Sequence, residues 1–160
     1  MWNYSTSNSY PNIILHDCIV EKIRIEETNL IFTFNDNGFW INKDNVHNPF
    51  GQILRTGRSE LKVVNIDMDY TDINIFEKVR LFNKPILTKL KNISLNDFIS
   101  KVNCGEWRFE FVNEYYAFHS AMFCGYLHSS KSSYSIYTQI EIMYDEIIYY
   151  WNKIYEDRTW

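Results

Sequence analysis

The chain has 160 residues, of which 46% are hydrophobic, and a formal net charge of −4. This length suits a single domain with a core of its own, and this composition excludes a disordered chain. The mildly acidic balance disfavours nucleic-acid binding, because such binding depends on Lys and Arg side chains that neutralise phosphates.

The N-terminal part of the chain predicts antiparallel strands. Residues 1–10 are polar and rich in Ser and Asn, so we expect a loose lead-in to one domain spanning 1–160. Between about 13 and 41, two runs at 19–25 and 30–34 alternate apolar and polar residues. An alternation of period two between turn residues is typical of hairpin-connected strands, so a β-meander is predicted here.

The middle of the chain is predicted as a loop followed by further strands. Residues 42–59 read as a long loop with one short strand at 52–54, and long loops are often functional. Further strands are expected at 61–68, 72–76, 79–82 and 85–87.

One short helix is predicted over 94–104. Ser94 suits the N-cap position and Asp97 the acidic position of a capping box. Gly105 follows the last turn, where a left-handed residue ends a helix. A single apolar stripe is formed by Leu95, Phe98, Ile99 and Val102.

The C-terminal third again favours strands. Alternation predicts a strand from Trp107, and 117–127 is apolar enough for a central strand covered on both sides. We expect a polar turn at 128–133 and a strand at 136–142. Segment 146–156 fits a strand or a helix, and its aromatic and β-branched residues favour a strand in a final hairpin. The predicted fold is mainly β, an antiparallel sandwich or partly open barrel with one short helix.

Three cysteines, an odd number, disfavour the disulfide framework of a secreted protein. The N-terminus shows neither the basic nor the apolar region of a signal peptide, and no apolar stretch reaches the roughly 20 residues that span a bilayer. We therefore expect a cytoplasmic protein that does not enter a membrane.

The candidate chemical site consists of His16, Asp17, Cys18 and His119. His16 and Cys18 are two residues apart, so on a strand they would share a face as a base and a nucleophile, with Asp17 pointing away. The structural alternative is that His16 and Asp17 bond backbone groups while Cys18 packs as a small hydrophobe.

A zinc site is a further alternative, although the sequence contains no recognised metal-binding spacing. It would require the fold to bring Cys18 beside 119–128. The potential zinc ligands are His16, Cys18, His119, Cys124 and His128. Because no recognised motif supports either chemistry, we assign no catalytic, metal-binding or cofactor-binding residue.

Charge and aromatic residues indicate a candidate interface. Residues 60–77 contain five acids and one base, whereas 78–91 contain five bases and no acid. Aromatic residues anchor many protein interfaces, although such residues also fill cores and short charge blocks also form solvated edges. The acidic segment and the strand from Glu106 to Tyr116 supply the candidates Asp67, Asp69, Asp72, Glu110, Glu114, Tyr115 and Tyr116.

The segments 15–18, 36–40 and 149–151 resemble those of small uncharacterised bacterial all-β proteins. Some proteins of this type belong to the immunity proteins that neutralise polymorphic toxins. The resemblance implies a non-enzymatic, cytoplasmic protein-binding domain, and an acidic inhibitor could cover the basic cleft of a nuclease toxin. One alternative is a small metal-binding or Cys/His-dependent enzyme. A second is a homo-oligomeric structural module whose exposed aromatics meet across a two-fold axis.

Overall fold

The computed structural model describes residues 1–82, 84–129 and 134–160. The chain is mainly β, with 59% strand and 8% helix, and every paired strand is antiparallel to its neighbour, which confirms the predicted fold class. Among the described residues, the only helices are too short and too polar to traverse a lipid bilayer.

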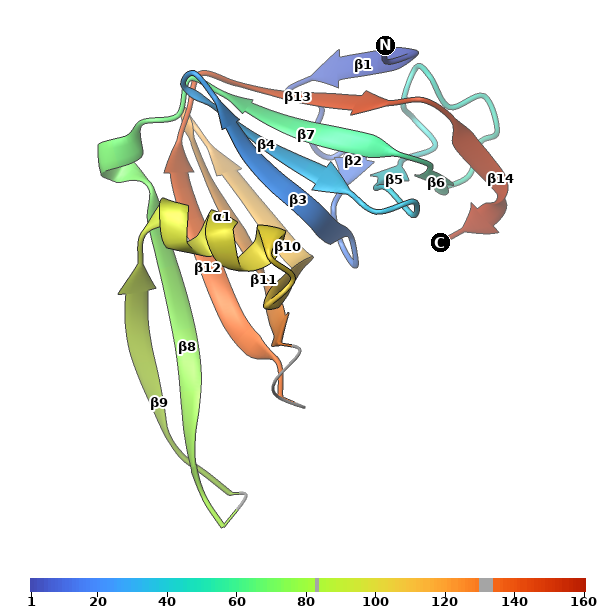
Figure 1. Ribbon diagram of the computed structural model, residues 1–160. Coiled ribbons are helices and arrows are strands. Elements are labelled where there is room, and N and C mark those ends of the chain that lie inside the picture. The colour runs from blue at the N-terminus through green and yellow to red at the C-terminus, as the bar shows by residue number, and fades with distance from the viewer. Residues whose placement is uncertain (83, 130–133) are drawn as a thin grey trace.

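The larger sheet has ten strands in the order β1-β13-β7-β4-β3-β10-β11-β12-β8-β9, and its described strands do not close into a barrel (Figure 1). These strands are β1 (Tyr4–Ser7), β3 (Ile19–Glu26), β4 (Asn29–Phe34), β7 (Ser59–Val64), β8 (Asp72–Leu81), β9 (Lys84–Ile93), β10 (Trp107–Ala117), β11 (Ser120–Ser129), β12 (Ile136–Met143) and β13 (Glu146–Trp151).

The smaller sheet has four strands in the order β14-β6-β5-β2. They are β2 (Ile13–Ile14), β5 (Trp40–Ile41), β6 (Leu54–Thr56) and β14 (Ile154–Thr159). Two helices complete the fold, the 3-10 helix η1 (Met68–Tyr70) and the α-helix α1 (Leu95–Asn103).

The predicted meander is correct only for its β3–β4 hairpin. The next strand, β5, leaves the larger sheet and pairs with β2 and β6. Gly38 makes this departure possible, because its φ is +51° and a Cβ at this position would lie 2.0 Å from Thr56 Oγ1. Residues 1–10 are also less loose than expected, since β1 pairs with β13.

The core lies between α1, the second sheet and one face of the larger sheet. Phe32, Phe111 and Phe123 meet edge to face, with ring centroids 5.5 to 6.2 Å apart. Phe98 brings α1 into the same cluster, and Ile41 brings in the second sheet. We call the side of the larger sheet that faces α1 the inner face, and the opposite side the outer face.

Several predicted boundaries change in the structure. The C-terminal segment is strand, but β13 lies between β1 and β7 and forms no hairpin with β12. The strand predicted at 61–68 ends at Val64, and those at 72–76 and 79–82 are one continuous strand, β8. Of the polar turn predicted at 128–133, His128 and Ser129 belong to β11, and 130–133 lie outside the described residues.

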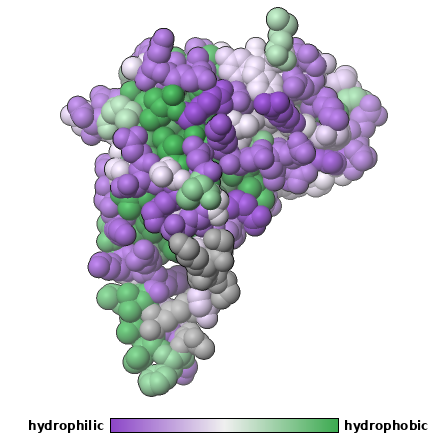
Figure 2. Space-filling model, viewed as in Figure 1, coloured by the Kyte–Doolittle hydropathy of each residue, from purple (hydrophilic) through white to green (hydrophobic). Residues whose placement is uncertain are grey.

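The β8–β9 hairpin extends beyond the rest of the sheet (Figure 1). β12 pairs with β8 only from Asp72 to Phe76, so the remainder of β8 pairs with β9 alone. We call residues 77–82 and 84–91 the arm. Figure 2 shows apolar side chains gathered on this projection.

Candidate functional site

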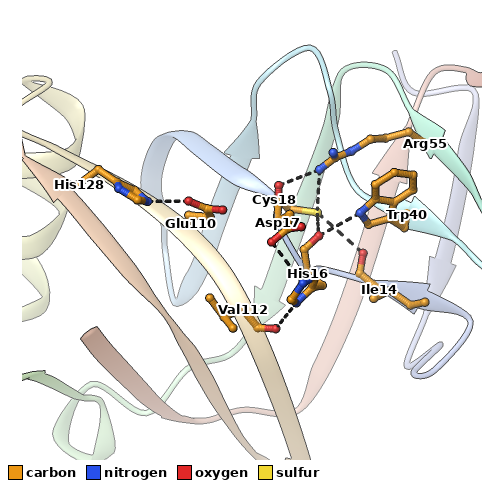
Figure 3. A network of polar contacts seen from close by, with 9 residues as sticks. All are labelled: Ile14, His16, Asp17, Cys18, Trp40, Arg55, Glu110, Val112 and His128. Atoms are coloured by element: carbon orange, nitrogen blue, oxygen red, sulfur yellow. Dashed lines mark hydrogen bonds and ion pairs between the residues drawn. The ribbon is translucent and has the colours of Figure 1, made fainter. Parts of the chain in front are cut away.

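The His16–Cys18 segment is a turn between β2 and β3 (Figure 3). Asp17 has a φ of +58°, so the expectation that His16 and Cys18 share one face of a strand is wrong. The bend also brings Asp17 to His16, with Oδ1 3.2 Å from Nε2. The other ring nitrogen, Nδ1, lies 2.7 Å from the carbonyl oxygen of Val112.

Backbone hydrogen bonds attach this turn to β10. The N–H of Asp17 donates to Phe111 O, and the N–H of Phe111 donates to Cys18 O, both at 2.9 Å. The second sheet holds the turn from the other side: Trp40 Nε1 donates to His16 O, and Arg55 donates to Asp17 O at 2.8 Å. These contacts give the turn an architectural role.

Cys18 is fully buried and unsuited to nucleophilic chemistry. Burial raises the pKa of its thiol to about 12, although the charge of Arg55 and its hydrogen bond lower it. The thiolate is the reactive form of cysteine, so the neutral thiol present near pH 7 is inert. Its hydrogen-bond acceptors are backbone carbonyls of Ile14 and His16.

The remaining candidate ligands do not converge on one point. His119 lies in the turn after β10, and its Nδ1 is 3.0 Å from Tyr144 O. His128 contacts Glu110, and Cys124 is buried. Across the parts of the chain that the structure describes, no three His, Cys, Asp or Glu side chains are grouped to hold a metal ion.

Sequence reasoning missed a Ser135–His128–Glu110 row. Ser135 Oγ lies 3.0 Å from His128 Nδ1, and His128 Nε2 lies 2.5 Å from Glu110 Oε2. This order of groups is the one that activates a serine in hydrolases, where oxyanion donors complete the site. Here Glu110 and His128 are diagonal neighbours on β10 and β11, so their contact joins the two strands, and we assign it a stabilising role.

Two of the predicted interface residues turn inward. Glu114 is buried and accepts hydrogen bonds from Leu15 N–H at 3.0 Å and from the Tyr116 hydroxyl at 2.9 Å. The Tyr116 hydroxyl also lies 2.9 Å from that of Tyr149. Burial raises the pKa of Glu114 to about 7, whereas these two hydrogen bonds and the charge of His16 lower it.

A β-bulge in β10 explains why Glu114 and Tyr116 point into the protein. The register of β10 against β11 shifts between Phe111 and Asn113. A bulge inserts one residue and exchanges the two faces of a strand, so Glu110 and Glu114 lie on opposite faces despite their even spacing. Tyr115 correspondingly lies on the outer face and is 54% exposed.

The outer face carries an acidic groove of about 430 Å³. Tyr115, Met122, Glu141 and Asp72 lie opposite one another across β10, β11, β12 and β8. Tyr70 and Met143 complete the apolar lining, and Asp72 and Glu141 are the only charged residues among the described ones that line the groove. We call this set the acidic groove.

The other acids of the 60–77 segment divide between the surface and the interior. Asp67 and Asp69 lie beside Tyr70 in and before η1, so they add negative charge near the groove. Glu60 instead is buried and pairs with Arg24, with oxygen–nitrogen distances of 2.8 and 3.0 Å. Of the predicted interface residues, the structure therefore brings Asp72 and Tyr115 together at the groove. Glu60 is not part of this candidate interface.

An aromatic row lies on the same face between the groove and the arm. The rings of Tyr126, Tyr137 and Phe76 follow one another across β11, β12 and β8, with centroids 5.8 and 5.5 Å apart. Leu90 of β9 extends the row and is 59% exposed. The outer face thus presents a groove, an aromatic row and the arm in sequence.

Comparisons with protein-family models, with curated proteins and with solved structures found no match to this chain. The motifs behind the resemblance to immunity proteins have structural positions. Residues 15–18 form the anchored turn, and Tyr149 and Trp151 are buried on β13. In this structure, these two motifs contribute to the packing of the domain.

Proposed function

We propose that this chain is a non-enzymatic, cytoplasmic protein-binding domain and that its acidic groove receives a basic protein partner. An immunity-type inhibitor of a toxin is the concrete form of this proposal. The observation that carries it is the gathering of Tyr70, Tyr115, Met122 and Met143 with carboxylates on an open face of the sheet. Tyrosine buries a large area at low entropic cost and often anchors interfaces.

The charge of the groove supports a basic partner. Asp72 and Glu141 line it, and Asp67 and Asp69 lie close by. Such a surface accelerates association with a positively charged cleft, and salt screens that attraction. The cleft of a nuclease toxin has the required sign of charge, because it binds phosphates.

The first experiment compares capture by three tagged proteins in the native cells. The groove variant carries Tyr115→Ala and Asp72→Asn. The matched control carries Phe50→Ala and Asp44→Asn, which remove an exposed aromatic and an exposed acid from the loop between β5 and β6. We expect wild type and control to capture one stoichiometric protein that the groove variant loses.

Titration with the purified partner then quantifies the contact. We expect the Kd of the groove variant to rise roughly 100-fold, as for loss of an interface anchor, and the wild-type Kd to rise with salt. An unchanged affinity and salt dependence would show that the groove is not the site. The proposal that the partner is a toxin is tested by expressing the captured partner alone and together with this chain. We expect the partner alone to stop growth and the chain to restore it. A partner that is harmless when expressed alone contradicts toxin inhibition.

A further inference from the structure

The arm exposes several large apolar side chains close together, and a contiguous exposed apolar patch often marks an interaction site. Leu81 is 55% exposed, Phe82 91%, and Ile86 and Leu87 60% each. Val79 and Leu87 face each other on one side of the hairpin, whereas Leu90 lies on the other side beside Phe76. Exposed apolar side chains therefore lie on both sides of the hairpin, which indicates that a partner covers it.

The free edge of β9 is protected against strand pairing. β9 is the last strand of the sheet, so one side of its backbone has no neighbouring strand among the residues that the structure describes. It carries Lys84, Pro85, Lys89 and Lys91, and lysine and proline on an edge strand oppose the addition of another strand. The arm must therefore dock through its side chains.

Charge identifies the kind of partner. The arm holds five basic residues and one acidic residue, a formal charge of +4. The rest of the chain then holds eleven basic and nineteen acidic residues, a formal charge of −8. An anionic membrane would attract the arm but repel the rest of the molecule, whereas a second copy of this chain offers a defined acidic groove that the basic arm can enter.

The acidic groove matches the arm in both charge and apolar character. Groove and arm lie toward opposite ends of β8 on one continuous outer face, and the aromatic row lies between them. Consider two copies whose outer faces meet with their aromatic rows in contact and their β8 strands antiparallel. The two-fold axis that relates these copies runs along the aromatic rows, and it places each arm over the groove of the other copy. Such a contact is self-complementary and closed.

We propose that the chain forms a two-fold dimer in which the arm of each copy docks in the acidic groove of the other. Lys78 and Lys84 approach Asp72 and Glu141 of the second copy, and Phe82 at the tip and Leu90 on the outer face cover its aromatic lining. The dimer uses the groove that we propose for a partner, but it forms without any partner. Failure of one proposal is therefore distinguishable from failure of the other.

Sedimentation of the purified protein at micromolar concentrations gives the first test. We expect the mass of two 19.3 kDa chains at low salt and dissociation as salt rises. A monomer at every concentration and salt level overturns the dimer. Replacing Phe82 and Leu90 with Ser should also yield monomer, while Val46→Ser, at a residue 91% exposed in another loop, should leave the dimer intact.

A charge exchange tests whether arm and groove meet. The arm variant carries Lys78→Glu and Lys84→Glu, and the groove variant carries Asp72→Lys and Glu141→Lys. All four side chains are exposed, so both variants should retain the wild-type circular dichroism spectrum. Each variant alone opposes like charges, and we expect its dimer Kd to rise roughly 100-fold.

An equimolar mixture of the two variants should recover the dimer. The acidic arm of one meets the basic groove of the other, and the native arm of the second meets the native groove of the first. A mixture that stays monomeric overturns the proposal. So does a wild-type monomer that binds phosphatidylserine vesicles through Phe82, because that result assigns the arm to a lipid surface.

Discussion

The backbone around Glu114 determines the direction and the environment of its side chain. The bulge in β10 turns its side chain into the protein, where Leu15 and Tyr116 donate hydrogen bonds to the two carboxylate oxygens. Removing a carboxylate from water disfavours its charged form more than these two bonds favour it. Its pKa is therefore raised to about 7 from an ordinary value of 4.5.

This pKa predicts a pH-dependent stability. Between about pH 4.5 and 7 the folded state keeps the Glu114 proton that the unfolded state has lost, so the free energy of unfolding falls as pH rises. The loss is about 3 kcal/mol for this shift. Glu114→Gln keeps an oxygen for Leu15 N–H and should remove this part of the pH dependence.

Urea unfolding of wild type and Glu114→Gln at about pH 5 and pH 8 measures the effect. The comparison between the two proteins cancels contributions from the histidines and the exposed acids. Parallel pH dependence in both proteins would contradict the raised pKa.

The sequence could not predict the position of Glu114. Even spacing places Glu110 and Glu114 on one face of a regular strand, and the bulge between Phe111 and Asn113 leaves no mark in the residue types. Asp72 and Tyr115 were identified because acid and tyrosine are themselves interface signals. Glu141 and Met122 were missed because only the register across four strands brings them to the same groove.

At the scale of elements, local signals were sufficient for α1. The Ser94 hydroxyl accepts a hydrogen bond from the N–H of Asp97 at 3.1 Å, and Gly105 has a φ of +75° just beyond the end of the helix. Strand partners are different, because pairing depends on residues far apart in sequence. Tyr4 lies opposite Trp151, and no local pattern specifies such a pair.

The cap of α1 can be tested by substitution. Ser94→Ala removes the acceptor of the Asp97 N–H and should lower the free energy of unfolding by about 1 kcal/mol. Ser100→Ala is the matched control, because Ser100 is exposed within the same helix and alanine favours helix. Equal urea midpoints for the two variants would show that the cap contributes nothing.

At the scale of the whole molecule, the described elements share one hydrophobic core. The same cluster includes Ile41 from the second sheet, Phe98 from α1 and Ile140 from the larger sheet. A core shared in this way couples the elements, so we expect a single cooperative unfolding transition. The urea curves from far-ultraviolet circular dichroism and from tryptophan fluorescence should coincide, measured on the arm variant so that association does not contribute. Two separated transitions would contradict a shared core.

The place of β13 has a consequence for synthesis of the chain. β13 lies between β1 and β7, although residues 146–151 leave the ribosome long after both neighbours. Until then β1 has no partner in the larger sheet and one edge of β7 stays open. The ten-stranded sheet is thus completed only after most of the chain has been translated, and its unpaired edges are natural binding sites for a chaperone during that interval.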